Sequence, residues 1–430
     1  MPRVYVEVYG CSANQADAEI ASGLLIEAGH LLVGSEEEAD VSVVLTCVVK
    51  TPTEIKIARR LRELVVAGRK VVIAGCMPKA LRSLVEEIAP NASMVGPDDL
   101  VMMSEAVEKT CKGRRVIFLD GSSPDRTLLP RERHSGVIHI APIASGCLGN
   151  CSYCIVKMAR GRLHSFPTEG IVEDARRAVQ SGCKEIWVTA EDTAAYDSNG
   201  VRLPELVERI NGIDGRFMIR IGMMTPNTAL PIIDSLVDSF KLEKVFRFLH
   251  VPVQSGNDEV LSLMRRKYTI KEFKEVIEVG RAAIPNLSIS TDLICGFPSE
   301  TEAQFKDSLS LVEWLKPDSV NISRFWPRPG TEAAGLEGQI HGRTTKDRSR
   351  RLNELWRRVQ MGVNKRWIGW EGEVLLDEEG HSGAKVGRNA SYKAVVIRTE
   401  AQLGDSIEVR VNKAGRGFLF GEEMHSRIDS

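Results

Sequence analysis

Three cysteines at short intervals are the most reactive feature of the sequence. Cys147, Cys151 and Cys154 lie in the segment GCLGNCSYC, a C-x3-C-x2-C spacing with no fourth cysteine nearby. Three thiolates can hold three irons of a [4Fe–4S] cube and leave one iron open for an exogenous ligand. A zinc knuckle is the structural alternative, but a closed zinc site has a fourth ligand. The spacing therefore predicts an iron–sulfur site with an open iron.

A second set of thiols follows three separate predicted strands. Cys11, Cys47 and Cys76 stand directly after VYG, VLT and IAG. Because parallel strands end at the same edge of a sheet, we expect these thiols to converge although they are far apart in sequence. A single buried cysteine is commonly structural, but three at equivalent positions predict a shared metal site. This site also lacks a fourth ligand.

Composition limits the class of protein. The 430 residues are 43% hydrophobic and 27% charged with a net charge of −1, which indicates an ordinary globular protein of two or three domains. No apolar run approaches the roughly 20 residues of a membrane span, so we expect a cytoplasmic protein without a membrane partner. Nine cysteines without a secretory signal favour metal binding over disulfides. Cys111, Cys183 and Cys295 are interpreted as structural.

Three successive patterns of predicted secondary structure indicate three domains. Residues 1–120 alternate strand and helix, which predicts a small α/β domain with a parallel sheet, and residues 121–136 are predicted to be a polar linker. Residues 135–366 contain six strand-like segments, most separated by helical stretches, which predicts a partial (β/α)6 barrel related to the TIM fold. Residues 367–430 have short strands and glycine turns, which predicts a small all-β barrel.

The first triad resembles that of the radical S-adenosylmethionine (SAM) superfamily, whose open iron is chelated by the amino and carboxylate groups of SAM. Both triads together make the chain similar to the methylthiotransferases over essentially its full length. The motifs that carry this resemblance are YGCSANQAD, LTCVVKTPTE, GCMPK, GCLGNCSYCIVKMARG, TAEDTAAY, HVPVQSGND, DLICGFPSET and RFWPRPGT. That family joins an N-terminal three-cysteine cluster domain, a radical SAM domain and a C-terminal RNA-binding TRAM barrel. The sequences of these motifs are most similar to those of the archaeal and eukaryotic branch.

The resemblance implies a tRNA-modifying enzyme with two [4Fe–4S] clusters and SAM. That branch converts N6-threonylcarbamoyladenosine at tRNA position 37 into its 2-methylthio derivative. The first cluster would cleave SAM to a radical that removes hydrogen from C2 of the adenine, and the second would hold the sulfur. Besides tRNA, an electron donor protein and a sulfur donor are expected partners, and the sequence identifies neither.

Side chains near the ends of the predicted barrel strands are candidates for binding SAM. Carboxylates can meet its amine and ribose, an arginine can meet its carboxylate, and glycine permits close backbone approach. The resemblance implies that TAED replaces the superfamily's glycine-rich amine-binding motif and that DLICGFPSE matches its fifth-strand motif. The candidates are Tyr153, Glu191, Asp192, Arg220, Gln254, Asp292 and Gly296.

Two basic segments are candidates for RNA contact. Between residues 341 and 370, nine Lys and Arg stand against two acids, which is typical of a tRNA-facing helix or of an ordinary solvated face. Residues 371–430 contain eight Lys and Arg against eleven Asp and Glu, so contact there would be local. The segment GAKVGRNASYKAV offers Lys385, Arg388 and Lys393, and Tyr392 could stack on a base.

Two other functions fit the same residues. A related enzyme could modify an aspartyl side chain of a ribosomal protein, because the two triads would serve equally. A non-catalytic RNA-binding protein could use both triads as structural metal sites. A closed structural site usually has four protein ligands, which disfavours the second alternative.

Overall fold

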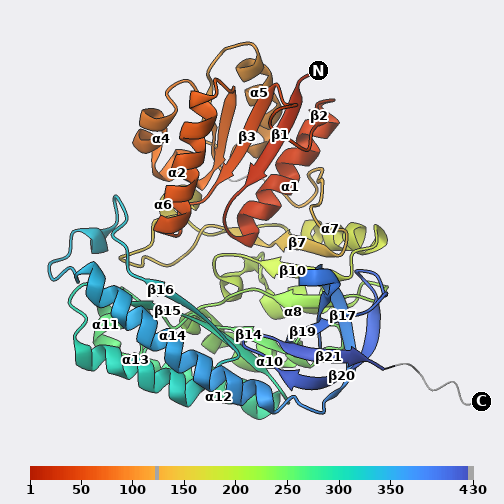
Figure 1. Cartoon of the computed structure of the whole chain (residues 1–430), viewed down its shortest axis with the longest axis vertical. Helices are drawn as coiled ribbons and strands as arrows, with labels where there is room; N and C mark the ends of the chain where they lie inside the picture. Colours follow the sequence, from red (N-terminus) through yellow and green to blue (C-terminus); the bar gives the residue numbers. More distant parts are fainter. Residues whose placement is uncertain (122–124, 425–430) are drawn as a thin grey trace, which may run out of the picture.

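Three folded units make up the molecule. The computed structural model describes residues 1–121 and 125–424; residues 122–124, in the predicted linker, and 425–430, at the end of the predicted last domain, lie outside the described residues. An N-terminal α/β unit lies above a larger β/α unit, and a small β-barrel lies beside the latter (Figure 1). Among the helices described, none is long and apolar enough to cross a membrane.

The N-terminal unit is built on a six-stranded parallel sheet with strand order β2-β1-β3-β4-β5-β6. Val43 and Leu45 pack on one face of this sheet with α1 and α5, whereas Val44 packs on the other with α2 and α4. Because helices cover both faces, the central strands β3 and β4 are buried along their whole length and are mostly apolar. The elements are β1 (Arg3–Val8), α1 (Ser12–Glu27), β2 (Leu31–Leu32), β3 (Val41–Thr46), α2 (Thr51–Val66), β4 (Val71–Gly75), α3 (Cys76–Ala80), α4 (Arg82–Ile88), β5 (Ser93–Val95), η1 (Leu100–Met102), α5 (Met103–Cys111) and β6 (Ile117–Phe118).

The central unit has six parallel strands, as predicted for a partial barrel. Strands β7, β10 and β13 form one sheet, β14, β15 and β16 form the other, and a bridge between Ile219 and Val245 joins them. The strands are β7 (Ile138–Pro142), β10 (Glu185–Thr189), β13 (Met218–Ile221), β14 (Phe248–His250), β15 (Ser288–Cys295) and β16 (Ser319–Arg324).

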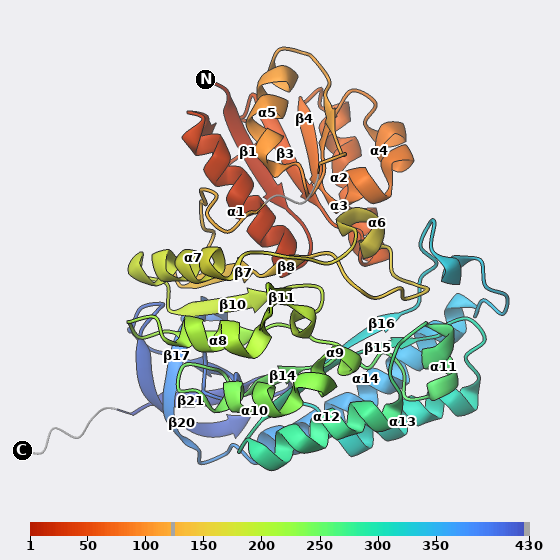
Figure 2. The same ribbon diagram turned by 180° about the vertical axis from the view of Figure 1, so that it is seen from behind.

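Helices pack around the outside of these strands (Figure 2). They are α7 (Thr168–Gln180), η2 (Thr193–Ala195), α8 (Leu203–Asn211), α9 (Pro226–Ala229), η3 (Leu230–Ile232), α10 (Ile233–Lys241), α11 (Asp258–Leu263), α12 (Ile270–Ala283), α13 (Glu302–Leu315), η4 (Glu332–Ala334) and α14 (Gly342–Lys365). The short helix α6 (Val156–Arg160) instead packs against α3 of the N-terminal unit (Figure 2). Short strands of two residues each lie in the loops: β8 (Ala144–Ser145), β9 (His164–Ser165), β11 (Asp197–Ser198) and β12 (Val201–Arg202).

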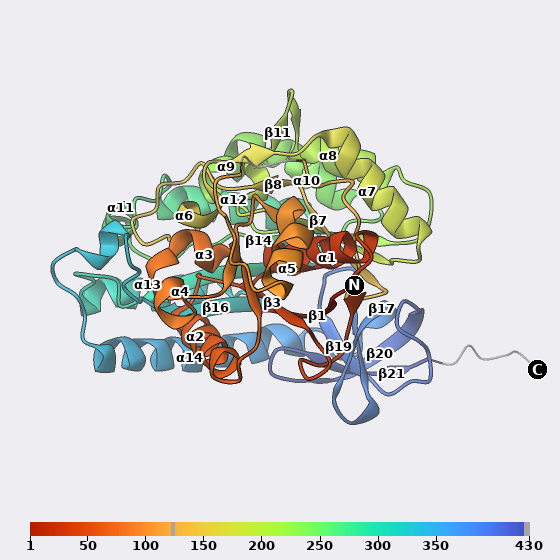
Figure 3. The same cartoon turned by 90° about the horizontal axis from the view of Figure 1, so that it is seen from above.

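The C-terminal unit is a closed barrel with strand order β17-β18-β19-β21-β20, which confirms the predicted all-β fold. Its small core includes Val374, Val395, Val409 and Leu419. The elements are β17 (Glu371–Glu379), η5 (His381–Gly383), β18 (Lys385–Arg388), β19 (Ala394–Ile397), β20 (Ser406–Ala414) and β21 (Leu419–Glu423). Seen from above, this barrel lies to one side of the N-terminal sheet (Figure 3).

The described part of the predicted linker is packed against the fold. Arg126 and Thr127 are buried, and the backbone of Glu132 donates to the carbonyl of Glu19 in α1. A Cβ added at Gly23 would lie 2.4 Å from the backbone of Pro130. The polar composition of this segment therefore reflects ion pairs and hydrogen bonds between domains, which a sequence pattern cannot distinguish from a solvated linker.

The small barrel closes against the first residues of the central strands. The amide of Arg247 donates to the carbonyl of Ala390, and Tyr392 packs edge-on against Phe246. Glu185, the first residue of β10, is fully buried there and accepts a hydrogen bond from the indole of Trp187. Burial raises the pKa of Glu185 to about 7, and the nearby carboxylate of Asp377 acts in the same direction.

This buried carboxyl predicts a pH-dependent stability. The folded chain keeps a proton on Glu185 that the unfolded chain loses near pH 4.5, so stability falls as the pH rises from about 4.5 to about 7. Glu185→Gln removes that loss, so at about pH 8 the variant should melt at a higher temperature than the wild type. Thermal unfolding across this pH range measures the difference, with Glu408→Gln on the exposed face of β20 as the control. An equal melting temperature at every pH would contradict the assignment.

Candidate active site

The loop after β8 gathers the first triad. The amide of Gly149 donates to the Sγ of Cys147 at 3.2 Å. A Cβ added at Gly149 would lie 3.2 Å from that sulfur and 3.7 Å from the Sγ of Cys151. Gly146 has a φ of +80°, and a Cβ there would clash with the backbone of Arg162, so the loop requires glycine to begin its turn.

The thiols of this loop have the chemistry of cluster ligands. Burial raises the pKa of the Cys154 thiol to about 11, with Cys151 adding to the rise, and burial also raises the pKa of Cys147. Metal binding releases such protons and offsets the cost of burying the thiolates. Over the described residues, no three His, Cys, Asp or Glu side chains converge on a single ion. A [4Fe–4S] cube does not require such convergence, because each thiolate binds a different iron.

Arg266 was not singled out from the sequence, yet it touches the first triad. Its guanidinium donates to the Sγ of Cys151 at 3.2 Å and to the hydroxyl of Tyr268 at 2.8 Å, and it stacks 4.8 Å from that ring. Tyr153, a predicted SAM contact, is half-buried beside Phe297, with ring centroids 6.4 Å apart. The first triad is thus held against a fixed positive charge.

The second triad forms at the edge predicted from the strand ends. Cys11 caps the start of α1, Cys47 follows β3 and Cys76 begins α3. A Cβ at Gly10 would lie 2.9 Å from the Sγ of Cys47, so the loop after β1 passes against that thiol. Burial raises the pKa of Cys76 to about 12, with smaller contributions from the charges of Cys11 and Cys47.

Asn14 joins the loops at this edge of the N-terminal sheet through hydrogen bonds. Its amide donates to the carbonyls of Tyr9 and Thr46 at 2.8 and 2.7 Å, and its Oδ1 lies 3.7 Å from the Sγ of Cys76. One side chain therefore ties the loops that carry all three thiols. The sequence YGCSANQAD contains this residue, but its spacing gave no sign of the role.

A buried arginine joins the two halves of the site. Arg160 of α6 donates to Asn14 at 3.1 Å and to Asp17 at 2.6 Å, and its Nε lies 3.4 Å from Glu191. On the other side, Arg126 donates to Asp17 at 2.8 Å. Asp17, Arg126 and Arg160 are all almost fully buried. The second triad and the end of β10 are therefore connected through one guanidinium.

The two predicted carboxylates after β10 have different surroundings. Asp192 accepts hydrogen bonds from the amide and hydroxyl of Thr225 and from the hydroxyl of Thr228, which occupy both its oxygens. Glu191 keeps one buried oxygen without a partner, and burial raises the pKa of its carboxyl. Glu191 is thus the better candidate for meeting the amine of a ligand, whereas Asp192 holds the turn at α9.

Of the other predicted SAM contacts, Gln254 and Asp292 lie side by side at β15, whereas Gly296 packs against α14. Gln254 has a φ of +71°, and its backbone pairs with β15 beside Asp292. Asp292 accepts from His250 at 3.0 Å and from Asn321 at 2.7 Å. At Gly296, a Cβ would lie 2.2 Å from Thr345 of α14, so close packing of this helix accounts for a glycine at this position.

The predicted RNA contacts of the small barrel are mostly committed to the protein. Lys393 is buried and donates to Asn364 at 2.6 Å and to Asp318 at 3.2 Å, and Arg388 pairs with Asp377 at 2.9 Å. Tyr392 packs against the central unit, so it does not offer its ring to an RNA base. The sequence analysis predicted that these residues contact RNA, whereas the structure places Tyr392 and Lys393 in a contact between domains. Lys385 remains partly exposed and donates to the carbonyl of Ala401.

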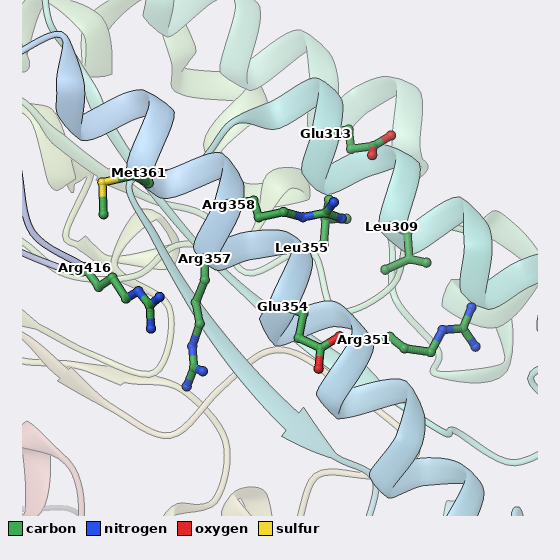
Figure 4. Close-up of a pocket in the computed structure, with 9 residues that line it drawn as sticks. All are labelled: Leu309, Glu313, Arg351, Glu354, Leu355, Arg357, Arg358, Met361 and Arg416. Carbon is green, nitrogen blue, oxygen red and sulfur yellow. The ribbon is translucent and has the colours of Figure 1, made fainter.

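Only part of the basic helix carries free charge. Ion pairs engage Arg348 with Glu300, Arg350 with Asp347 and Glu354, and Arg351 with Glu302. Arg357 and Arg358 are exposed and make no ion pair within the described residues, and neither does Arg416 from the turn between β20 and β21. Arg357, Arg358 and Arg416 line one pocket with Leu355 and Met361 (Figure 4). We call these three arginines the arginine surface.

Three known domains match the chain. Residues 142–312 match the Radical SAM superfamily, residues 3–96 match the Uncharacterized protein family UPF0004, and residues 365–423 match the TRAM domain. The radical SAM match implies SAM and a [4Fe–4S] cluster. Among solved structures, the radical S-adenosylmethionine methyltransferase TsrM from Kitasatospora setae aligns with a TM-score of 0.58 at 15% identity, covering 78% of this chain and 77% of that one. That likeness shows a shared fold.

Curated relatives match nearly the whole chain. A probable threonylcarbamoyladenosine tRNA methylthiotransferase of Pyrococcus horikoshii is 41% identical over 426 residues, covering 98% of this chain and 99% of that protein. The threonylcarbamoyladenosine tRNA methylthiotransferase of Xenopus laevis is 35% identical over 434 residues, covering 98% of this chain and 77% of that protein. The chain belongs to the threonylcarbamoyladenosine tRNA methylthiotransferase family.

Proposed function

We propose that this protein is a tRNA methylthiotransferase that replaces the C2 hydrogen of N6-threonylcarbamoyladenosine at position 37 with a methylthio group. The observation that carries the proposal is the pair of three-thiol sites linked through Arg160 and Glu191. The names of the archaeal and animal relatives favour tRNA over a ribosomal protein as the substrate.

Each triad holds one cluster in this proposal. Cys147, Cys151 and Cys154 bind a [4Fe–4S] cluster, which when bound supplies one electron to cleave SAM and so gives a radical able to take a hydrogen atom from an inert C–H bond. Cys11, Cys47 and Cys76 would hold a second cluster that presents the sulfur, and a second molecule of SAM would supply the methyl group. Glu191 orients the amine of SAM while Arg160 keeps that carboxylate in place. The electron donor and the sulfur donor are separate proteins or molecules, and the compartment is the cytoplasm.

The two triads have separable roles, which predicts different products from their variants. Cys147→Ala should abolish both 5′-deoxyadenosine formation and methylthiolation, because SAM is no longer cleaved. Cys47→Ala should keep SAM cleavage and lose methylthiolation. Mass spectrometry of digested tRNA and of the small-molecule products measures both. Cys111→Ala, at the end of α5 and away from both sites, is the matched control. Methylthio nucleoside from either triad variant would refute the proposal.

Arg266 is expected to tune the first cluster. A positive charge that donates to a ligand sulfur favours the reduced form, so Arg266→Gln should lower the midpoint potential by on the order of 60 mV, the one-electron equivalent of about 1.4 kcal/mol. Arg266→Lys should restore part of the shift. Redox titration followed by electron paramagnetic resonance measures the potential on the reconstituted protein. An unchanged potential in Arg266→Gln would show that its contact with Cys151 serves packing alone.

The arginine surface is expected to bind tRNA phosphates. Replacing Arg357 and Arg416 by alanine together should weaken tRNA binding and reduce the slope of log K against log salt by about 2, near one unit for each phosphate contact. Arg350→Ala is the matched control, because that exposed arginine lies on the same helix but is neutralised by Asp347 and Glu354. Equal slopes for the double variant and the wild type would exclude this surface from the tRNA path.

A further inference from the structure

One face of the central strands is lined by polar and aromatic side chains that the proposed chemistry leaves unused. Trp187 on β10 and Arg220 on β13 are partly exposed, whereas their neighbours Ile186 and Ile219 are fully buried. Alternate residues of a strand share a face, and the register pairs Trp187 with Arg220 directly. This face therefore points away from the helices and toward the inside of the partial barrel.

The same inner face continues on the next three strands. His250 on β14, Asp292 on β15 and Asn321 on β16 keep some exposure and are joined by hydrogen bonds to the carboxylate of Asp292. Burial works to raise the pKa of Asp292, but the hydrogen bond and charge of His250 hold it below its ordinary value. The carboxylate of Asp292 therefore already receives hydrogen bonds from neighbouring side chains of the inner face.

Arg220 stands in a box of aromatic rings. Its guanidinium carbon lies 4.7 Å from the ring centroid of Trp187, 5.3 Å from that of Phe248 and 5.2 Å from that of Tyr392. The third ring comes from the turn between β18 and β19 of the TRAM domain. Cation–π contacts on three rings hold the guanidinium in place and keep its planar fork oriented.

The arginine lacks an anionic partner. No carboxylate pairs with Arg220 in the described parts of the chain, and its buried Nε has no hydrogen-bond partner there. Two carboxylates lie near this box: Glu185 accepts from Trp187 and Asp377 pairs with Arg388, each through one oxygen, and neither forms an ion pair with Arg220. A half-buried guanidinium that packs among rings without an anion is costly, and a ligand with a negative charge would offset that cost.

We propose that Arg220 binds the carboxylate of the threonylcarbamoyl group and so makes the enzyme specific for adenosine that already carries this group. The inference rests on the proposed function, because that function supplies a substrate whose N6 group ends in a carboxylate. Arginine matches a carboxylate with two parallel hydrogen bonds, which an unmodified or apolar N6 group cannot make. Trp187 and Phe248 provide apolar walls beside the nucleobase.

The position of Arg220 along its strand favours the substrate over SAM as the source of the carboxylate. Arg220 pairs with Trp187, which lies four residues before Glu191, so Arg220 is about 13 Å deeper along the strands than Glu191. SAM bound at the open iron would occupy the strand ends. The carboxylate of SAM would therefore lie at the strand ends and that of the substrate deeper in the barrel. Separate measurements of SAM affinity and substrate affinity can show which carboxylate Arg220 binds.

The test measures binding of three anticodon stem-loops by the reconstituted protein: one with threonylcarbamoyladenosine, one with its methyl ester and one with adenosine. The wild type should bind the acid on the order of 10-fold to 100-fold more tightly than the ester, the range of a charged hydrogen bond. Arg220→Gln should bind acid and ester equally while its affinity for SAM stays that of the wild type. Arg220→Lys should recover part of the preference.

Controls separate this inference from folding and from the proposed function. Arg216→Gln, an exposed arginine just before β13 that pairs with Glu373, should keep the full preference for the acid. Equal affinity of the wild type for acid and ester would overturn the inference, as would an Arg220→Gln variant that loses SAM and keeps the preference. Absence of methylthio product with intact acid preference would overturn the function and leave the recognition standing, because binding and product are measured separately.

Discussion

Asp17, buried between Arg126 and Arg160, is the interaction on which the arrangement of the active site depends. A carboxylate with both oxygens held by guanidiniums at 2.8 and 2.6 Å is stable away from water only while both partners remain. Arg126 comes from the connector and Arg160 from the helix after the first triad. The ion pairs therefore fix the N-terminal domain, the connector and the radical SAM domain in one relative position.

That constraint has a chemical consequence. Arg160 also reaches Asn14, which organises the second triad, and Glu191, which stands at the strand ends near the first. In the proposed reaction the two triads act on one adenine, so independent movement of either domain would separate them. A rigid charged contact at this boundary therefore suits a reaction in which a carbon radical and a sulfur must meet.

The sequence predicted the parts of this account that depend on local pattern. Strand alternation, the C-x3-C-x2-C loop and three cysteines at strand ends were sufficient for the domain order and fold class, because each signal lies within a short window. Arg160 and Arg266 were not found, since their roles arise from contacts across more than 100 positions. Tyr392 and Lys393 were expected to face RNA, because composition cannot reveal that a TRAM turn is buried against another domain.

The buried turn between β18 and β19 gives the TRAM domain a structural role inside the central barrel. Besides Arg416 of the arginine surface, it contributes Tyr392 to the aromatic box around Arg220, so the inner face of the barrel is complete only when this domain is docked. The central claim, however, is that one chain carries two clusters. Iron and sulfide analysis after anaerobic reconstitution tests it most directly: we expect about eight irons for the wild type and about four for Cys47→Ala, whereas about four in both would contradict the account.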